Sequence, residues 1–230
     1  MNYITRKFEH VEKNLLGYDD LVAETSNSGR VYFTPDGIKY PSVTTVLSIL
    51  TKDAINEWRA RVGAEEANKV SKRASARGTK VHSIIENYLN NDPNCLDNLM
   101  PHVLNNFNSI KSYLDECIGD IYALEAPLYS HHLTLAGRVD CVAEWDGKLS
   151  IIDFKTSNRI KEKDKIENYF IQEAAYAIMW EERTGMPITQ LVTLIAGDEG
   201  AQVFIEHRDN HTTKLLSTIK EYNRKSLFGN

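Results

Sequence analysis

The sequence predicts an α/β fold in which a central mixed β-sheet is flanked by helices. Two β-type runs, Arg138–Trp145 and Lys148–Phe154, are joined by Asp146-Gly147, a dipeptide typical of a tight hairpin turn. Apolar residues occupy both faces of these runs, which indicates central strands covered by helices on both sides. The order of a helix, three strands, a helix and a strand is that of an α/β sandwich.

The other elements follow from turn residues, caps and hydrophobic periodicity. Ser42 is expected to cap the first helix, with Pro41 fixing its entry. The full set comprises a hairpin of 30–34 and 38–40 around Pro35-Asp36-Gly37, helices over 43–50, 53–75, 78–89 and 100–117, a strand over 121–130, the central hairpin, a helix over 166–182, strands over 191–196 and 203–207, and a helix over 211–225.

One domain spanning residues 1–230 is expected, because the sequence contains no repeat, low-complexity tract or Pro/Gly-rich linker. It divides into an N-terminal extension with a hairpin and helices (1–75), the core (76–207) and a C-terminal helix (208–230). No apolar run approaches the length of a membrane span, and the first residues do not resemble a signal peptide. We therefore expect a cytoplasmic protein, of viral, phage or bacterial origin, with no membrane partner.

Charge and cysteine content exclude some classes of protein. The net charge of −5 is not that of a uniformly basic nucleic-acid coat. The three cysteines form no CxxC pair, so an iron–sulfur cluster, a zinc ribbon and a disulfide scaffold are not expected. Two basic runs are either solvated faces or phosphate-binding surfaces: Lys69, Lys72, Arg73, Arg77 and Lys80, and Arg159, Lys161, Lys163 and Lys165.

The central hairpin carries the strongest indication of function. With the turn at 146–147, Asp140 lies opposite Asp153, and period-2 alternation puts Lys155 on the same face as Asp153. Such charges can be solvated on a surface hairpin, but inside a covered sheet they are costly unless a cation is bound. We predict one or two Mg²⁺ or Mn²⁺ ions held by Asp140, Asp153, the main-chain carbonyl of Phe154 and His82. Lys155 would position the water that hydrolyses a phosphodiester.

Further polar residues are candidates for supporting roles. His82 and Glu86 share one helix face, and so do Gln172 and Tyr176, since each pair is separated by four residues. Each pair can also be explained as ordinary structure. Glu125, in the first predicted strand, is either a site residue or an exposed sheet residue.

These residues together resemble the PD-(D/E)XK nuclease superfamily. Val139-Asp140 followed by Asp153-Phe154-Lys155 is similar to its core motif, with Val139 in place of the proline. The longer pattern resembles the RecB-type exonuclease branch, and within it the mitochondrial genome maintenance exonucleases and their phage relatives. The resemblance covers roughly residues 30–195 and rests also on Tyr40–Leu47, Trp58-Arg59, Gly78-Thr79 with His82 and Glu86, Glu125, Gly137-Arg138, Thr156-Ser157, and Gln172 with Tyr176.

The resemblance implies metal binding by His82, Asp140 and Asp153, and catalysis by Lys155 with support from Gln172 and Tyr176. It also implies a restriction-endonuclease-like core and a DNA exonuclease that needs a free, preferably single-stranded end, acting in replication, repair or recombination. Two alternatives remain: a double-strand-specific lambda-type exonuclease, and a non-catalytic nucleic-acid-binding subunit. A monomer is favoured. Expected DNA contacts are Ser42, Thr44, Arg59, Arg77 and Lys80.

Overall fold

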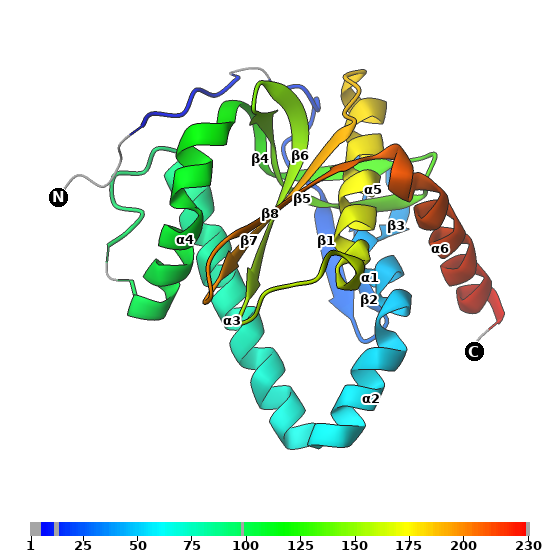
Figure 1. The fold of residues 1–230 in the computed structure, drawn as a ribbon. Coiled ribbons are helices and arrows are strands. Elements are labelled where there is room, and N and C mark those ends of the chain that lie inside the picture. The colour runs from blue at the N-terminus through cyan, green and yellow to red at the C-terminus, as the bar shows by residue number, and fades with distance from the viewer. Residues whose placement is uncertain (1–5, 12–13, 98, 229–230) are drawn as a thin grey trace.

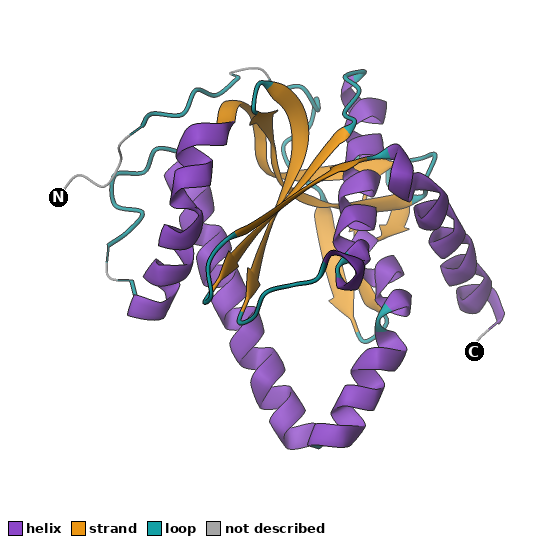
Figure 2. Cartoon of the chain, viewed as in Figure 1, coloured by secondary structure: helices purple, strands orange, loops and turns teal. Residues whose placement is uncertain are grey.

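The computed structural model describes residues 6–11, 14–97 and 99–228; residues 1–5, 12–13, 98 and 229–230 of the predicted domain therefore lie outside the described residues. Its centre is a five-stranded sheet, visible in Figures 1 and 2. In spatial order the strands are β4 (Ile118–Ser130), β5 (Leu135–Trp145), β6 (Lys148–Ser157), β7 (Gln190–Gly197) and β8 (Gln202–His207). Only β6 and β7 are parallel to each other, so the predicted mixed sheet is confirmed.

Helices cover both faces of this sheet, as the apolar faces of the central strands predict. α3 (Ala64–Leu89) and α4 (Pro101–Cys117) pack on one face. α5 (Glu167–Thr184) packs on the other, with α1 (Val43–Leu47) and α6 (Asp209–Phe228) beside it. None of the helices in the described part of the chain has the length and apolarity that a membrane span requires.

A separate three-stranded sheet precedes the core. It contains β1 (Val22–Ser26), β2 (Gly29–Phe33) and β3 (Lys39–Pro41), all antiparallel. The hairpin of β2 and β3 is the predicted one, whereas β1 was not expected. Two short 3₁₀ segments, 48–50 and 163–165, follow α1 and precede α5.

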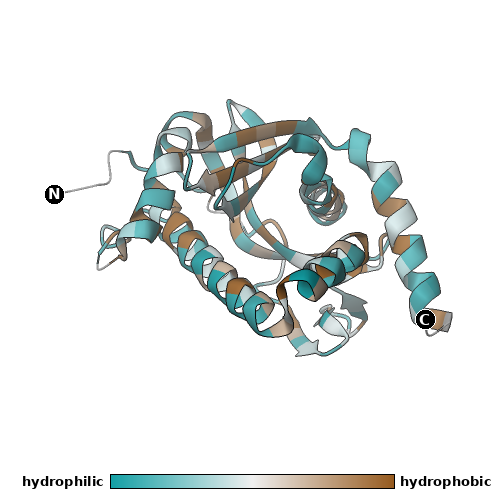
Figure 3. Ribbon diagram, turned by 60° about the horizontal axis from the view of Figure 1, so that its bottom comes forward, coloured by the Kyte–Doolittle hydropathy of each residue, from teal (hydrophilic) through white to brown (hydrophobic). Residues whose placement is uncertain are grey.

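Helices α2 (Lys52–Val62) and α3 differ from the sequence prediction. The helix expected over 53–75 breaks at Gly63, where φ is +86°, a backbone angle that favours glycine. Conversely, α3 runs through Gly78 without a break, and the predicted junction between extension and core falls inside it. None of residues 52–62 is buried. We call residues 52–77 the arm; it projects from the body in Figure 1 and is largely hydrophilic in Figure 3.

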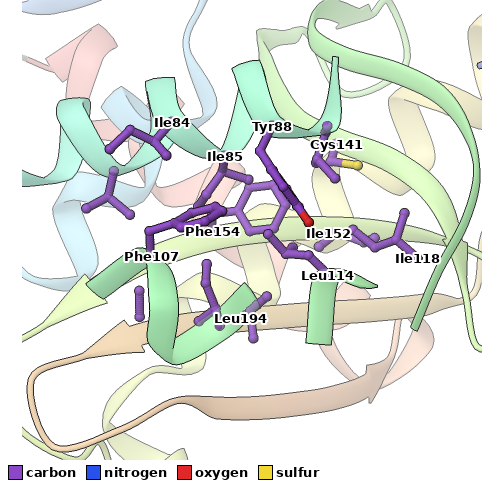
Figure 4. Packing of buried hydrophobic residues seen from close by; sticks show 14 of the residues in the cluster. Ile84, Ile85, Tyr88, Phe107, Leu114, Ile118, Cys141, Ile152, Phe154 and Leu194 are labelled. Carbon is purple, nitrogen blue, oxygen red and sulfur yellow. The ribbon is translucent and has the colours of Figure 1, made fainter. Parts of the chain in front are cut away.

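Two apolar cores hold the sheet between its helices. On the first face, Ile85 and Tyr88 of α3 meet Phe107 of α4, over Ile152 and Phe154 of β6 (Figure 4). Tyr88 and Phe107 contact edge to face, with ring centroids 5.1 Å apart. The second core lies between the sheet and α5. The two cores fix α3 and α5 on opposite sides of the central hairpin.

Candidate active site

The turn between β5 and β6 sets the register of the central hairpin. Residues 146 and 147 have φ angles of 51° and 74°, as a tight hairpin turn requires. Pairing begins with Trp145 opposite Lys148 and keeps one register until Cys141 lies opposite Ile152. This is the register that the Asp-Gly turn predicts.

The ladder stops one pair short of the predicted acidic pair. Asp140 and Asp153 are not cross-strand partners in it. Instead, Asp140 Oδ2 accepts a hydrogen bond from the main-chain N–H of Phe154, at 2.9 Å. The main-chain ladder therefore ends before this position, because the Asp140 side chain replaces the main chain as the partner of β6, and the direct opposition expected from the turn stays a prediction.

A backbone irregularity in the neighbouring strand accompanies this change. Glu125 in β4 has φ of +46°, which is uncommon for a residue other than glycine. Its place in the register is opposite Asp140. Along β5, Val139 packs in the core under α5, whereas Cys141 packs in the core under α3 and α4. The alternation of faces thus inverts at Asp140, where strict period-2 reasoning fails.

Three side chains converge at this inversion. The candidate ligand atoms of His82, Glu125 and Asp140 all lie within 4.8 Å of one another. His82 Nδ1, on α3, is 3.6 Å from Asp140 Oδ2. Burial, followed by the charge of Asp140, raises the pKa of Glu125 to about 7, and Glu86 contributes in the same direction. Glu125 is therefore a central residue of the site, and Glu86 acts on it through its charge.

This cluster suits a divalent cation. It offers one imidazole and two carboxylates, an oxygen-rich donor set compatible with Mg²⁺ or Mn²⁺. Burial first, and the charge of Asp140 second, raise the pKa of Glu125 and so disfavour its ionised form, and a bound cation would offset both. Asp153 lies outside this group of three, and ligation by Asp153 and by the carbonyl of Phe154 stays a prediction.

Asp153, which is buried, and Lys155, which is half-buried, form an ion pair beside the cluster. Asp153 is 1% exposed. Burial raises the pKa of Asp153 to about 6, partly opposed by Lys155. Burial alone would lower the pKa of Lys155, but the charges of Asp153 and Asp140 raise it above its usual value. The Lys155 ammonium also lies 5.2 Å from the centre of the Tyr169 ring. Lys155 is thus kept cationic.

Helix α5 supplies the polar side chains behind this pair. Gln172 Nε2 donates to Asp153 Oδ1 and to Tyr176 Oη, both at 3.4 Å. The Tyr176 ring packs on Gly137 of β5: a Cβ at Gly137 would lie 2.7 Å from its Cε1 atom. Only glycine allows this approach. Gln172 and Tyr176, predicted as supporting residues, therefore lie beside Asp153.

One acidic residue of α5 was not predicted. Glu173 is fully buried, and its Oε1 accepts a hydrogen bond from the Thr193 hydroxyl of β7. Burial, followed by the charge of Asp153, raises the pKa of Glu173 well above its usual value. Its signal in the sequence is a glutamate within an apolar helix, four residues after Tyr169, which places both on one face.

The predicted DNA contacts near the N-terminus all have partners within the protein, and their contact with DNA stays a prediction. Ser42 is buried and caps α1, because its Oγ accepts the Thr45 N–H at 3.0 Å. Thr44 is exposed, and its hydroxyl is 3.0 Å from that of Ser42. Arg59 donates to Asn68 at 2.8 Å and so ties α2 to α3 within the arm.

The two other predicted DNA contacts lie on α3. Arg77 forms an ion pair with Asp198 of the β7–β8 turn, at 3.2 Å. Lys80 is exposed. Both belong to the face of α3 that is directed away from His82, since neighbouring helical residues are separated by about 100°.

The chain has a mixed β-sheet between helices, and an imidazole, several carboxylates and a lysine lie where the ladder of its central hairpin ends. This is the architecture of a nuclease core. Residues 104–225, more than half of the chain, match the family model of the PD-(D/E)XK nuclease superfamily. The chain belongs to this superfamily, which confirms the resemblance.

Individual relatives agree with this assignment. The chain is 25% identical over 203 residues to mitochondrial genome maintenance exonuclease 1 of Homo sapiens, and 26% identical to that of Mus musculus. Each alignment covers 80% of this chain, and 58% and 59% of those proteins. The chain thus spans about three fifths of their length. Among solved structures, the crystal structure of SSO0001 aligns with 64% of this chain and 73% of its own, at 12% identity and a TM-score of 0.36.

Proposed function

We propose that this chain is a divalent-cation-dependent DNA exonuclease that prefers single-stranded ends and acts in DNA replication, repair or recombination. The observation that carries the proposal is the cluster of His82, Glu125 and Asp140 beside the Asp153–Lys155 pair. Membership of the nuclease superfamily and the similarity to exonucleases support nucleic acid as the substrate and hydrolysis as the reaction.

The three clustered side chains would hold Mg²⁺ or Mn²⁺, with Asp153 as a further ligand. When bound, the cation supplies Lewis-acid stabilisation of the charge on the scissile phosphate. His82 comes from α3, Glu125 from β4 and Asp140 from β5, so the fold holds the three ligands on three separate elements.

Lys155 has the chemistry to act on the attacking water and on the phosphate. Its ammonium is held cationic by the charge of the buried Asp153, while its side chain stays partly exposed to solvent. There it can orient a water molecule and balance negative charge that develops on the phosphoryl oxygens. Gln172 restrains the carboxylate of Asp153, and Tyr176 restrains Gln172. A lysine that is fixed by its neighbours needs little rearrangement during the reaction.

An end-labelled nuclease assay tests the proposal. Single-stranded and blunt duplex DNA, each with free or blocked ends, are incubated with Mg²⁺, Mn²⁺ or EDTA. We expect cleavage of single strands with a free end, none in EDTA, and none by Lys155→Met. Lys148→Met is the matched control, because it removes an exposed lysine from the opposite end of the same strand.

The other outcomes contradict the proposal in distinct ways. Cleavage confined to duplex ends would favour a lambda-type exonuclease. Normal binding of DNA with no cleavage under any metal condition would favour a non-catalytic subunit. Cleavage by Lys155→Met at the rate of Lys148→Met would place the catalytic residues elsewhere.

A further inference from the structure

A basic cleft lies on the opposite side of α3 from the metal-ligand cluster. It has a volume of about 490 Å³ and opens where α3 and α4 diverge. Its polar lining comes from α3, from the start of α4 and from the residue that follows β6: Arg73, Arg77, Lys80, His102 and Asn158. None of the described residues that line it is acidic. We call this surface the basic cleft.

Helical geometry explains why the cleft and the metal-ligand cluster face opposite ways. At about 100° per residue, Arg73 and Lys80 lie about 180° and about 160° around α3 from His82. The same face of α3 also bears Ile84, further along the helix, which is buried in the core between α3 and α4. The basic cleft is therefore the outward extension of the α3–α4 contact, with cations in place of apolar residues.

The charges of the cleft are only partly neutralised within the protein. Arg77 pairs with Asp198 at 3.2 Å. Within the described part of the chain, Arg73 and Lys80 have no carboxylate partner. Arg73 and Lys80 thus leave two uncompensated cations within about two turns of α3, in a protein whose net charge is −5. A concave surface with this arrangement and an adjacent amide is suited to an anion that carries several charges, such as a nucleic-acid backbone.

The position of the cleft relates it to the candidate active site. Asn158 is three residues beyond Lys155, which corresponds to about 10 Å of extended chain. α3 packs closely on β6 between the two sites, since a Cβ at Gly78 would lie 3.8 Å from Thr156 Oγ1. A strand would therefore pass around the end of β6, where Arg159 is exposed.

We infer that the basic cleft binds the phosphate backbone of a single nucleic-acid strand at a distance from the scissile bond, on the far side of α3. This inference rests on the proposed nuclease function, because it assigns the cleft to the same substrate strand. Arg73 and Lys80 provide the direct phosphate contacts, while Arg77 is held in place by Asp198. A strand too short to reach around β6 would occupy the candidate active site alone.

Binding measured without metal tests the cleft separately from cleavage. Fluorescence anisotropy in EDTA gives affinities for single-stranded oligothymidylates of about 6 and about 30 nucleotides, across a range of salt concentrations. The test variant is Arg73→Gln/Lys80→Gln. The matched control, Lys214→Gln/Lys220→Gln, removes two charges from exposed positions of α6. Thermal unfolding followed by circular dichroism establishes that both variants are folded.

We expect the ratio of long-strand to short-strand affinity to fall about tenfold in the test variant and to stay unchanged in the control. The slope of log affinity against log salt for the long strand should decrease by about 1.4, corresponding to two lost phosphate contacts. Equal weakening for both lengths, or an unchanged salt slope, would overturn the inference. Failure of the nuclease assay with a preserved length effect would instead contradict the proposed function and leave the cleft as a nucleic-acid site.

Discussion

Acidification through pH 7 is expected to weaken cation binding because a proton must leave Glu125 before the cation binds. Burial and the charge of Asp140 raise the pKa of Glu125 to about 7. At pH 6 about one tenth of the Glu125 carboxyls would then be ionised, and at pH 5 about one hundredth. The apparent affinity for Mg²⁺ or Mn²⁺ should fall about tenfold per pH unit below 7, or about 1.4 kcal/mol per unit. A glutamate with an ordinary pKa would show no such change above about pH 5.

Isothermal titration calorimetry measures both the affinity and the released proton. Titrations of Mn²⁺ at pH 6, 7 and 8, each in two buffers of different ionisation enthalpy, should show proton release that is largest at pH 6. Glu125→Gln should bind more weakly at pH 8 and lose most of the pH dependence. A wild-type affinity that stays constant from pH 6 to 8, with no proton released, would refute the reasoning.

The same pKa shift has a consequence for stability. The pKa of Glu125 in the folded chain lies above its value of about 4.5 in the unfolded chain. Its contribution is therefore fully present below about pH 4.5 and is lost as the pH rises through about 7. Cation binding should reverse this trend, so added Mn²⁺ should raise the melting temperature more at pH 8 than at pH 6.

Three further predictions concern the hairpin and its neighbours. Gly137→Ala should lower the free energy of unfolding by about 1–3 kcal/mol in chemical denaturation, because the new Cβ would meet the buried Tyr176 ring. Adding Tyr176→Leu should recover stability but not activity. An unaltered denaturation midpoint for Gly137→Ala alone would contradict this packing. Lys155→Met should abolish single-turnover cleavage while keeping cation binding in calorimetry, and loss of both together would show that Lys155 chiefly supports the metal ligands. Gly147→Ala should lower the free energy of unfolding by about 1 kcal/mol, since φ is +74° at this position, and should not slow cleavage. Slower cleavage would mean that the turn affects the distant site.

The sequence was sufficient for the parts of the fold that local rules determine. The Asp-Gly turn fixes the register of β5 and β6, and Ser42 caps α1 as its position before a helical run predicts. The end of the β5–β6 ladder at Asp140 could not be predicted in the same way. It coincides with the hydrogen bond from Phe154 N–H to the Asp140 side chain and with the positive φ of Glu125 on another strand, and no local pattern encodes either.

Tertiary context also decides which glycine ends a helix. Gly63 and Gly78 are equivalent in a propensity scale, yet the first ends α2 and the second lies within α3. Gly78 remains helical where α3 packs closely over β6. The site prediction undervalued Glu125 and missed Glu173 for a related reason, since their roles follow from burial next to Asp140 and Asp153.

The continuity of α3 has a mechanical consequence. Its 26 residues form one uninterrupted helix, about 39 Å long, that begins at the tip of the arm and carries His82 in its inner half, next to the buried Val81. No joint separates the outer half from the half that bears the imidazole. The part of the arm that belongs to α3 is therefore continuous with the segment that carries His82, and a tilt of that part would move the imidazole.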